Sequence, residues 1–216
     1  MNNIFGILAS IIFIAIVIIS ASFFEKAGKE ASRKFIHIML ANWWFIAMMY
    51  FDNVFFAMLV PAIFILVNYL SYKNNIINVM EREDEDNKSL GTVYYALSLF
   101  ILSIYSFGFL KDPVVGLCGV MVMGYGDGFA AIVGTSIKSP KYTIGKNTKT
   151  LAGTITMFCI TLIIMSGYFL YYNTSYIVIK AILVSVLITI VEAISIKGTD
   201  NISVPLLTSL LAVLMV

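Results

Sequence analysis

Long apolar runs, separated by short polar or charged clusters, dominate the sequence. Eight such runs can be distinguished. Seven have about the length that a membrane-spanning helix needs, and the last is shorter. They are Ile4–Phe24, Phe35–Phe51, Val54–Tyr72, Leu90–Leu110, Pro113–Thr135, Leu151–Tyr172, Tyr176–Ile196 and Ile202–Val216. The pattern predicts an all-α, polytopic integral membrane protein with about eight transmembrane helices, forming a single transmembrane domain over residues 1–216.

The composition supports this interpretation and limits the function classes. Hydrophobic residues make up 60% of the chain and charged residues 12%, whereas a soluble domain has about half apolar and a quarter charged residues. The first run is longer than the apolar core of a cleaved signal peptide and lacks basic residues before it, so we expect a retained span. The sequence therefore predicts a multi-pass protein of the cell membrane, with the lipid bilayer and no nucleic acid as partner.

The distribution of lysine and arginine predicts the orientation. Of the 14 basic residues, twelve lie in the alternate connections that follow the first, third, fifth and seventh runs. Only Lys111 and Lys180 lie on the other side. The positive-inside rule then places the N-terminus outside and the basic, longer loops in the cytosol. The active face is therefore expected to be cytosolic.

Asp127 is the most costly residue to place in this arrangement. It lies within the fifth run, in Gly124–Gly128, roughly 21 Å from the external end by helical rise. A carboxylate at that depth is expensive unless it is paired, hydrated or bound to metal, so it indicates a functional site. The flanking glycines allow backbone or ligand to approach closely. The structural alternative is an ion pair with a Lys or Arg of a neighbouring helix.

Two further carboxylates are predicted near the same level. Glu192 lies roughly 24 Å into the seventh run, and Asp200 opens the eighth run from the cytosolic side. Oxygen ligands converging from three helices are what Mg²⁺ requires, so Asp127, Glu192 and Asp200 are candidate metal ligands. The alternative for Glu192 and Asp200 is that their side chains reach out to the membrane surface.

A basic group begins the second run. Arg33 and His37 are four residues apart and share a helix face, where they could hold an anion or act as acid and base. Arg33 and Lys34 could instead anchor the helix among lipid headgroups. His37, the only histidine of the chain, is the stronger catalytic candidate beside Asp127.

The segment from Lys138 to Thr150 has a composition that suits a polyphosphate. It contains four lysines, no acidic residue and several hydroxyl and amide groups. Positive-inside charge alone would explain the lysines but not the accompanying polar donors. Neither a P-loop nor a Rossmann glycine pattern is present, so a nucleotide would be bound without those scaffolds. The candidate nucleotide-binding residues here are Lys146, Asn147, Lys149, Thr150 and Gly153.

At this point five ordered blocks resemble a known family. They are Arg33–His37, Lys88–Tyr94, Gly126–Ala130, Lys146–Gly153 and Val191–Glu192 followed by Lys197–Pro205. Their order is similar to that in the CTP-dependent lipid-alcohol kinases, which include phytol, dolichol and diacylglycerol kinases and are related to phosphatidate cytidylyltransferase. The resemblance extends from the second run to the eighth.

The resemblance implies transfer of a phosphoryl group from a nucleoside triphosphate, with CTP favoured, to the hydroxyl of a membrane lipid alcohol, with Mg²⁺ as cofactor. It adds Arg33, Lys88, Gly126 and Gly128 to the residues expected to bind the nucleotide. Family members often carry a second Asp at the position of Ala131 and an Arg at that of Thr135.

Two other functions are compatible with these residues. A cytidylyltransferase would join CMP to a lipid phosphate with the same metal and lysines, and only the products distinguish it. A small ion-coupled transporter would use Asp127 and Glu192 as a relay. Transport predicts an acidic pathway to both faces, yet the external halves of the runs lack buried charge.

Overall fold

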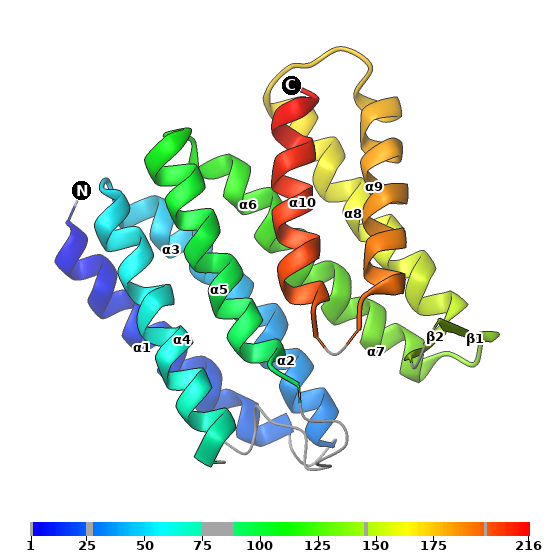
Figure 1. Ribbon diagram of the computed structural model, residues 1–216, viewed down its shortest axis with the longest axis horizontal. Coiled ribbons are helices and arrows are strands. Elements are labelled where there is room, and N and C mark those ends of the chain that lie inside the picture. The colour runs from blue at the N-terminus through cyan, green and yellow to red at the C-terminus, as the bar shows by residue number, and fades with distance from the viewer. Residues whose placement is uncertain (1, 25–27, 75–88, 145–146, 197) are drawn as a thin grey trace.

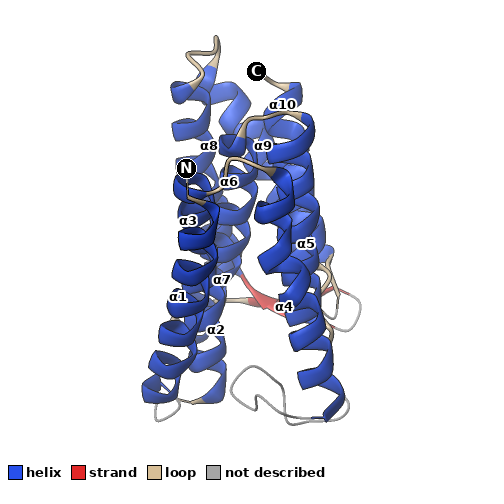
Figure 2. Cartoon of the chain, turned by 90° about the vertical axis from the view of Figure 1, so that its left-hand side faces the viewer, coloured by secondary structure: helices blue, strands red, loops and turns tan. Residues whose placement is uncertain are grey.

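The chain forms a bundle of helices that alternate in direction (Figure 1). The computed structural model describes residues 2–24, 28–74, 89–144, 147–196 and 198–216. Both termini lie toward the end of the bundle opposite a small β-hairpin (Figures 1 and 2). The predicted all-α class is confirmed apart from this hairpin.

Six helical segments of the described chain are long and apolar enough to cross a membrane. They make the chain a polytopic helical membrane protein, as the hydropathy pattern predicts. The six are α1 (Asn3–Phe24), α4 (Val54–Asn74), α5 (Gly91–Ser103) continued by the π-helical η4 (Ile104–Phe109), the segment Pro113–Ser136, α8 (Leu151–Tyr171) and α9 (Ile177–Ile194).

The second and eighth predicted spans are the two that do not reach this length. The second is divided at Asn42 into α2 (Lys29–Ala41) and α3 (Trp43–Tyr50). Its first turns carry charged residues and are amphipathic rather than apolar. The eighth is α10 (Asp200–Leu214), with 15 residues. A count of eight spans therefore stays a prediction.

The outer faces of the long helices are apolar and exposed. Ile163 of α8 is 71% exposed and Val178 of α9 is 66% exposed, and the same holds for Ile11 of α1 and Leu66 of α4. Apolar surface on this scale would drive a soluble protein to aggregate. In this chain it forms the surface that contacts lipid.

The segment Pro113–Ser136 is the centre of the bundle. It consists of α6 (Pro113–Met121), the π-helical turn η5 (Val122–Asp127) and α7 (Gly128–Ser136). In its most apolar stretch, 67% of the residues are buried inside the protein, against 28–39% in the other five segments. Glycines let its neighbours approach: a Cβ on Gly116 would lie 2.1 Å from the Trp44 ring, and one on Gly119 2.4 Å from Pro205 O. Such small-residue contacts are how membrane helices pack closely.

A β-hairpin lies between α7 and α8, where a loop is expected from the sequence. Strand β1 (Lys141–Ile144) pairs antiparallel with β2 (Asn147–Thr150), with Tyr142 opposite Lys149. The Thr150 hydroxyl then caps α8 by accepting a hydrogen bond from Gly153 N at 3.2 Å. The hairpin is thereby fixed to the start of α8 and presents Lys149 to the bundle.

Gly116→Ala tests the close packing of the central segment. The added methyl group would overlap the buried Trp44 ring, and overpacking of this kind costs about 1–3 kcal/mol. We expect the apparent melting temperature in detergent to fall by several degrees. Gly167→Ala on α8 is the control, because a Cβ there meets nothing within 4 Å. An equal effect of both substitutions would contradict the packing account.

Candidate active site

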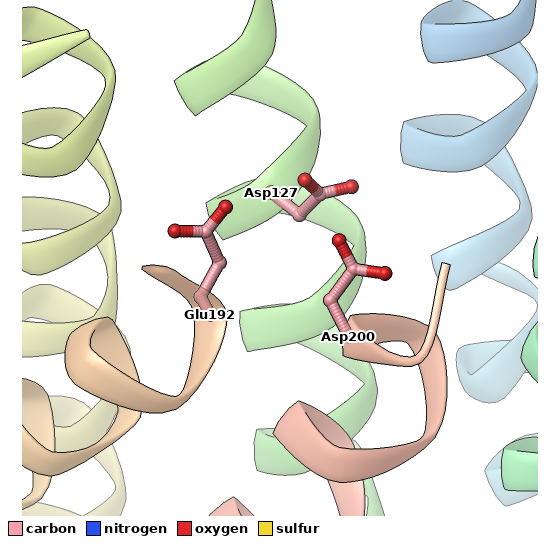
Figure 3. Close-up of side chains that lie close together, drawn as sticks. All are labelled: Asp127, Glu192 and Asp200. Atoms are coloured by element: carbon pink, nitrogen blue, oxygen red, sulfur yellow. The ribbon is translucent and has the colours of Figure 1, made fainter. Parts of the chain in front are cut away.

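Three carboxylates from distant parts of the chain meet in the interior. Asp127 ends η5, Glu192 lies near the end of α9, and Asp200 begins α10. One oxygen of each lies within 4.8 Å of the others, and Figure 3 shows the side chains turned toward one another. Asp127 and Glu192 are only 8% and 5% exposed. We call Asp127, Glu192 and Asp200 the carboxylate triad.

The position of Asp127 follows from the π-helical turn and the glycines around it. A Cβ on Gly126 would lie 2.7 Å from Met157 Sδ, and one on Gly128 2.3 Å from Ile38 Cγ1. The absence of a side chain at Gly126 and Gly128 thus lets Met157 of α8 and Ile38 of α2 lie against the backbone on either side of Asp127. Single π-helical turns within α-helices are frequent at functional sites. In the structure these two glycines allow neighbouring helices to approach Asp127 closely. That they also bind a nucleotide stays a prediction.

Lys34 and His37 contact Asp127 from α2. Lys34 Nζ lies 2.7 Å from Asp127 Oδ2, and His37 Nε2 lies 3.2 Å from the same oxygen. These side chains are mostly buried, with 14% of the Lys34 side chain and 12% of the His37 side chain exposed. The ion pair compensates part of the cost of burying the carboxylate.

The surroundings of His37 define which ring nitrogen donates. Nε2 also lies 3.1 Å from Met123 O, which belongs to η5. Since Met123 O and the Asp127 carboxylate are both acceptors, Nε2 carries the hydrogen. The Tyr95 hydroxyl donates to His37 O at 3.1 Å, and the two rings meet edge to face. His37 Nε2 therefore donates to Met123 O, and Asp127 Oδ2 lies close to the same nitrogen.

Lys149 contacts the opposite side of the triad. Its ammonium group donates to Glu192 O at 2.7 Å and forms a close ion pair with Glu192 Oε1. Lys149 lies on strand β2, so the hairpin brings a positive charge to Glu192. The periodicity of the helices alone does not predict this contact. The predicted site residues Lys149 and Glu192 are therefore brought together.

The connection between α9 and α10 positions Asp200. Gly198 has a φ of +83°, and a Cβ there would lie 2.7 Å from Gly91 Cα. The Asn201 amide donates to Gly91 O at 2.9 Å and fixes the start of α10 against α5. The positive φ and the close approach both require glycine at this position.

The residues present fit a divalent cation. Three carboxylates supply hard oxygen ligands, which Mg²⁺ prefers. Among the described residues that contact the triad, Lys34 and Lys149 supply two positive charges against three negative ones. Mutual repulsion of three clustered carboxylates favours a further cation among them. The predicted Mg²⁺ ligands thus lie at a suitable separation, although binding of the ion stays a prediction.

A groove opens beside the triad, between α1, α2, α4 and α5. We call it the α1–α4 groove. Its polar end is lined by residues of the site and of the neighbouring helix starts, and its other end is apolar. The polar members include Arg33, Lys34, His37, Asn68, Asp127, Asp200 and Asn201, and the apolar ones Ile14, Leu40, Trp43, Val60, Pro61, Phe64, Ala96 and Leu99.

The other predicted nucleotide-binding residues are only partly described. Arg33 lines the groove and pairs with Glu30 at 2.6 Å. Thr150 and Gly153 form the cap of α8, and a Cβ on Gly153 would lie 2.8 Å from Ala130 O. Lys88 and Lys146 lie outside the described residues, as does the side chain of Asn147. Their role in binding nucleotide stays a prediction.

Several residues at the site were not predicted as functional. A headgroup anchor was one interpretation of Lys34, and an ion pair with a Lys or Arg of a neighbouring helix was the structural alternative for Asp127. The structure shows that ion pair, and Lys34 is the partner. Its spacing of three residues from His37 puts both on one helix face and could have indicated this. Tyr95, Asn68 and Asn201 carried no signal, because their partners are backbone carbonyls of other helices.

Curated proteins named phytol kinase are similar to this chain over most of its length. It is 30% identical to the phytol kinase of Synechocystis sp. over 193 residues, which cover 85% of the chain and 78% of that protein. It is 31% identical to a probable phytol kinase of Triticum aestivum over 208 residues, covering 87% and 68%. Phytol kinase 1 of Arabidopsis thaliana is 30% identical over 206 residues, covering 86% and 66%. No family model and no solved structure matches the chain.

Lys34→Met tests the charge balance of the triad. Removing the ammonium group leaves Asp127 buried with less compensation, which costs about 3–5 kcal/mol. We expect a large fall in the apparent melting temperature, and a larger increase on adding Mg²⁺ than in the unmodified protein. Lys180→Met is the control, since Lys180 of α9 lies over the ring of Phe169 in α8, away from the triad. Equal Mg²⁺ responses of all three proteins would contradict the account.

Proposed function

Because the chain belongs to the phytol kinase family of lipid-alcohol kinases, we propose that it transfers the terminal phosphoryl group of a nucleoside triphosphate to a membrane lipid alcohol. CTP is the proposed donor and a lipid monophosphate the product. The observation that supports this best is the carboxylate triad, which lies between Lys34 and Lys149 at the polar end of a groove. Phosphoryl transfer depends chiefly on positioning and charge neutralisation, which such a site offers.

The proposed reaction is a single displacement at phosphorus. The alcohol oxygen forms a bond to the terminal phosphorus, while the bond from that phosphorus to its bridging oxygen breaks. The nucleoside diphosphate leaves with the electron pair, and the hydroxyl proton passes to a base. Asp127, Glu192 and Asp200 would hold Mg²⁺, which would neutralise the charge of the phosphate oxygens.

The lysines are the proposed phosphate ligands. Lys149 lies on β2 and Lys34 on α2, so their ammonium groups approach the triad from two sides. Each would exchange part of its contact with a carboxylate for a phosphate oxygen when the nucleotide binds. Lys146, Asn147 and Thr150 of the hairpin segment, together with Gly153, Lys88 and Arg33, are proposed to bind the remainder of the nucleotide.

Asp127 is the proposed base for the hydroxyl proton. His37 and Asp127 are the two candidates, and His37 Nε2 already carries the hydrogen that it donates. His37 then acts as a positioning residue, because its Nε2 lies 3.2 Å from Asp127 Oδ2. A carboxylate that accepts the proton at its groove side can return it to water after transfer.

The orientation is part of the same proposal. With α2–α3 and α10 counted as crossings, the chain has eight antiparallel spans, and the basic connections lie in the cytosol. The triad then lies near the cytosolic boundary, where the nucleotide is available. The membrane-bound alcohol would reach it from within the bilayer.

Asp127→Asn tests the proposed reaction. Purified protein with Mg²⁺, labelled CTP and phytol should yield phytyl monophosphate and CDP, and we expect the substitution to lower turnover by a factor of about 100 or more. Asp112→Asn is the control, because Asp112 caps α6 away from the triad. In sealed vesicles of the unmodified protein, turnover should require CTP on the cytosolic side.

The products and the histidine variants complete this experiment. Release of pyrophosphate with CMP attached to the lipid would identify a cytidylyltransferase and contradict the kinase. His37→Gln retains an amide donor near the position of Nε2, so it should keep more activity than His37→Ala. Equal losses in the two histidine variants would favour His37 as the base instead.

A further inference from the structure

The β-hairpin and the end of α7 carry positive charge that the carboxylate triad does not use. No acidic residue lies between Asp127 and Glu192 in the sequence, and the lysines of this stretch, Lys180 excepted, lie in the segment from Lys138 to Thr150. Figure 1 shows the hairpin at the outer edge of the bundle, beside the end of α7 and the start of α8. The structure divides the described lysines of this segment between two sides of the hairpin.

The register of the hairpin separates Lys149 from Lys141. Lys149 pairs with Tyr142, so their side chains share one face of the two-stranded sheet. This face meets the bundle, because Lys149 contacts Glu192 and the Tyr142 hydroxyl forms a hydrogen bond with Thr154 Oγ1 of α8. Lys141 precedes Tyr142 by one position, so its side chain points to the opposite face, and it is exposed. Lys141 is therefore directed away from the triad.

Lys138 and Lys141 are exposed cations without an acidic partner. Lys138 follows the end of α7 at Ser136 by two residues and is exposed, as Lys141 is. Within the part of the chain that the structure describes, neither lysine forms an ion pair. We call Lys138 and Lys141 the basic surface. Its two charges are available to an anion from outside the protein.

Hydrogen bonds fix the segment that carries the basic surface to the start of α8. Leu151 N donates to Pro140 O at 2.9 Å, and Ala152 N donates to Ser139 Oγ at 3.1 Å. Pro140 and Ser139 lie between the two lysines in the sequence. The backbone of the basic surface is thus held in place beside α8, which lowers the entropic cost of binding a ligand there.

The apolar surface that contacts lipid begins at the level of Lys141. Lys141 is the cross-strand partner of Thr150, which caps α8. Leu151 follows directly and is 45% exposed, and Ile155, one turn further along α8, is 54% exposed. Ile137, at the end of α7, is 55% exposed. Lysines next to exposed apolar side chains lie where phospholipid headgroups meet the hydrocarbon, and their ammonium groups can reach the phosphates.

We propose that Lys138 and Lys141 bind the phosphate of an anionic phospholipid of the bilayer, whose acyl chains cover the exposed side chains of Ile137, Leu151 and Ile155. A phospholipid joins a negative charge to hydrocarbon at the depth where the basic surface joins apolar residues. A nucleotide matches the charge but has no apolar part to cover the isoleucines. Each lysine near an anionic bilayer surface contributes about a fivefold preference. This inference does not depend on the proposed function.

A charge-matched pair of double variants tests the basic surface. Native mass spectrometry of the purified protein in mixed micelles, with equal amounts of phosphatidylglycerol and phosphatidylcholine, measures the ratio of the two bound lipids. We expect the hairpin variant, Lys138→Gln with Lys141→Gln, to lower this ratio about fivefold or more. The control, Lys111→Gln with Lys180→Gln, removes the same charge before α6 and near the start of α9, and should keep the ratio within about twofold. A decrease in the hairpin variant no larger than in the control would overturn the proposal.

Addition of CTP and Mg²⁺ to the unmodified protein distinguishes a lipid from a nucleotide at the same lysines. Because Lys141 is directed away from the triad, excess CTP should leave the ratio of bound phosphatidylglycerol to phosphatidylcholine within about twofold. Displacement of phosphatidylglycerol by CTP would make the basic surface part of a nucleotide site and overturn the proposal. Selective phosphatidylglycerol binding in a protein that transfers no phosphate would refute the proposed function while supporting this inference.

Discussion

The rest of the site depends on one electrostatic constraint: three carboxylates share a small volume inside a membrane protein. Their mutual repulsion and their loss of hydration are both unfavourable, so nearby cations must compensate the negative charge. Lys34 compensates Asp127 from α2, and Lys149 compensates Glu192 from the hairpin. These pairs tie α2, η5, β2 and α9 to one point, so the charge balance and the arrangement of the helices depend on each other.

Close helix packing makes this convergence possible. The central segment Pro113–Ser136 has glycines at the points where α3, α10, α2 and α8 approach it. Because no side chain separates the helices there, Asp127 can reach carboxylates that lie 65 and 73 positions later in the sequence. The close approach of Gly198 to Gly91 has the same effect at the start of α10. The glycines at these helix contacts thus allow the three carboxylates to lie close together.

Hydropathy predicts the helices well but predicts their internal irregularities poorly. The observed ends of α4, α8 and α9 lie within two residues of the predicted runs. The π-helical turn before Asp127 and the break at Asn42 were not predicted, because both depend on how neighbouring helices pack. The hairpin was not predicted because its two strands have only four residues each and are mostly polar. The lysines of this segment pointed to a basic loop instead.

The sequence predicts those residues of the candidate site whose burial in a membrane is energetically unfavourable. Asp127 and Glu192 stand out because each is a carboxylate in an apolar run, and their predicted depths agreed closely enough to suggest one site. Lys34 was missed because a lysine at a helix end has an ordinary explanation in headgroup contact. Asn68 and Asn201 pair with backbone atoms of α5, a relation that the sequence does not encode locally.

Binding of Mn²⁺, a paramagnetic substitute for Mg²⁺, tests most directly whether the carboxylate triad is a divalent-cation site. Electron paramagnetic resonance of the purified protein should detect one class of bound Mn²⁺ in the presence of CTP. The account predicts that Asp127→Asn, Glu192→Gln and Asp200→Asn each weaken this binding about tenfold or more, while Asp112→Asn does not. Mn²⁺ binding that is unchanged in all three triad variants would contradict the central claim.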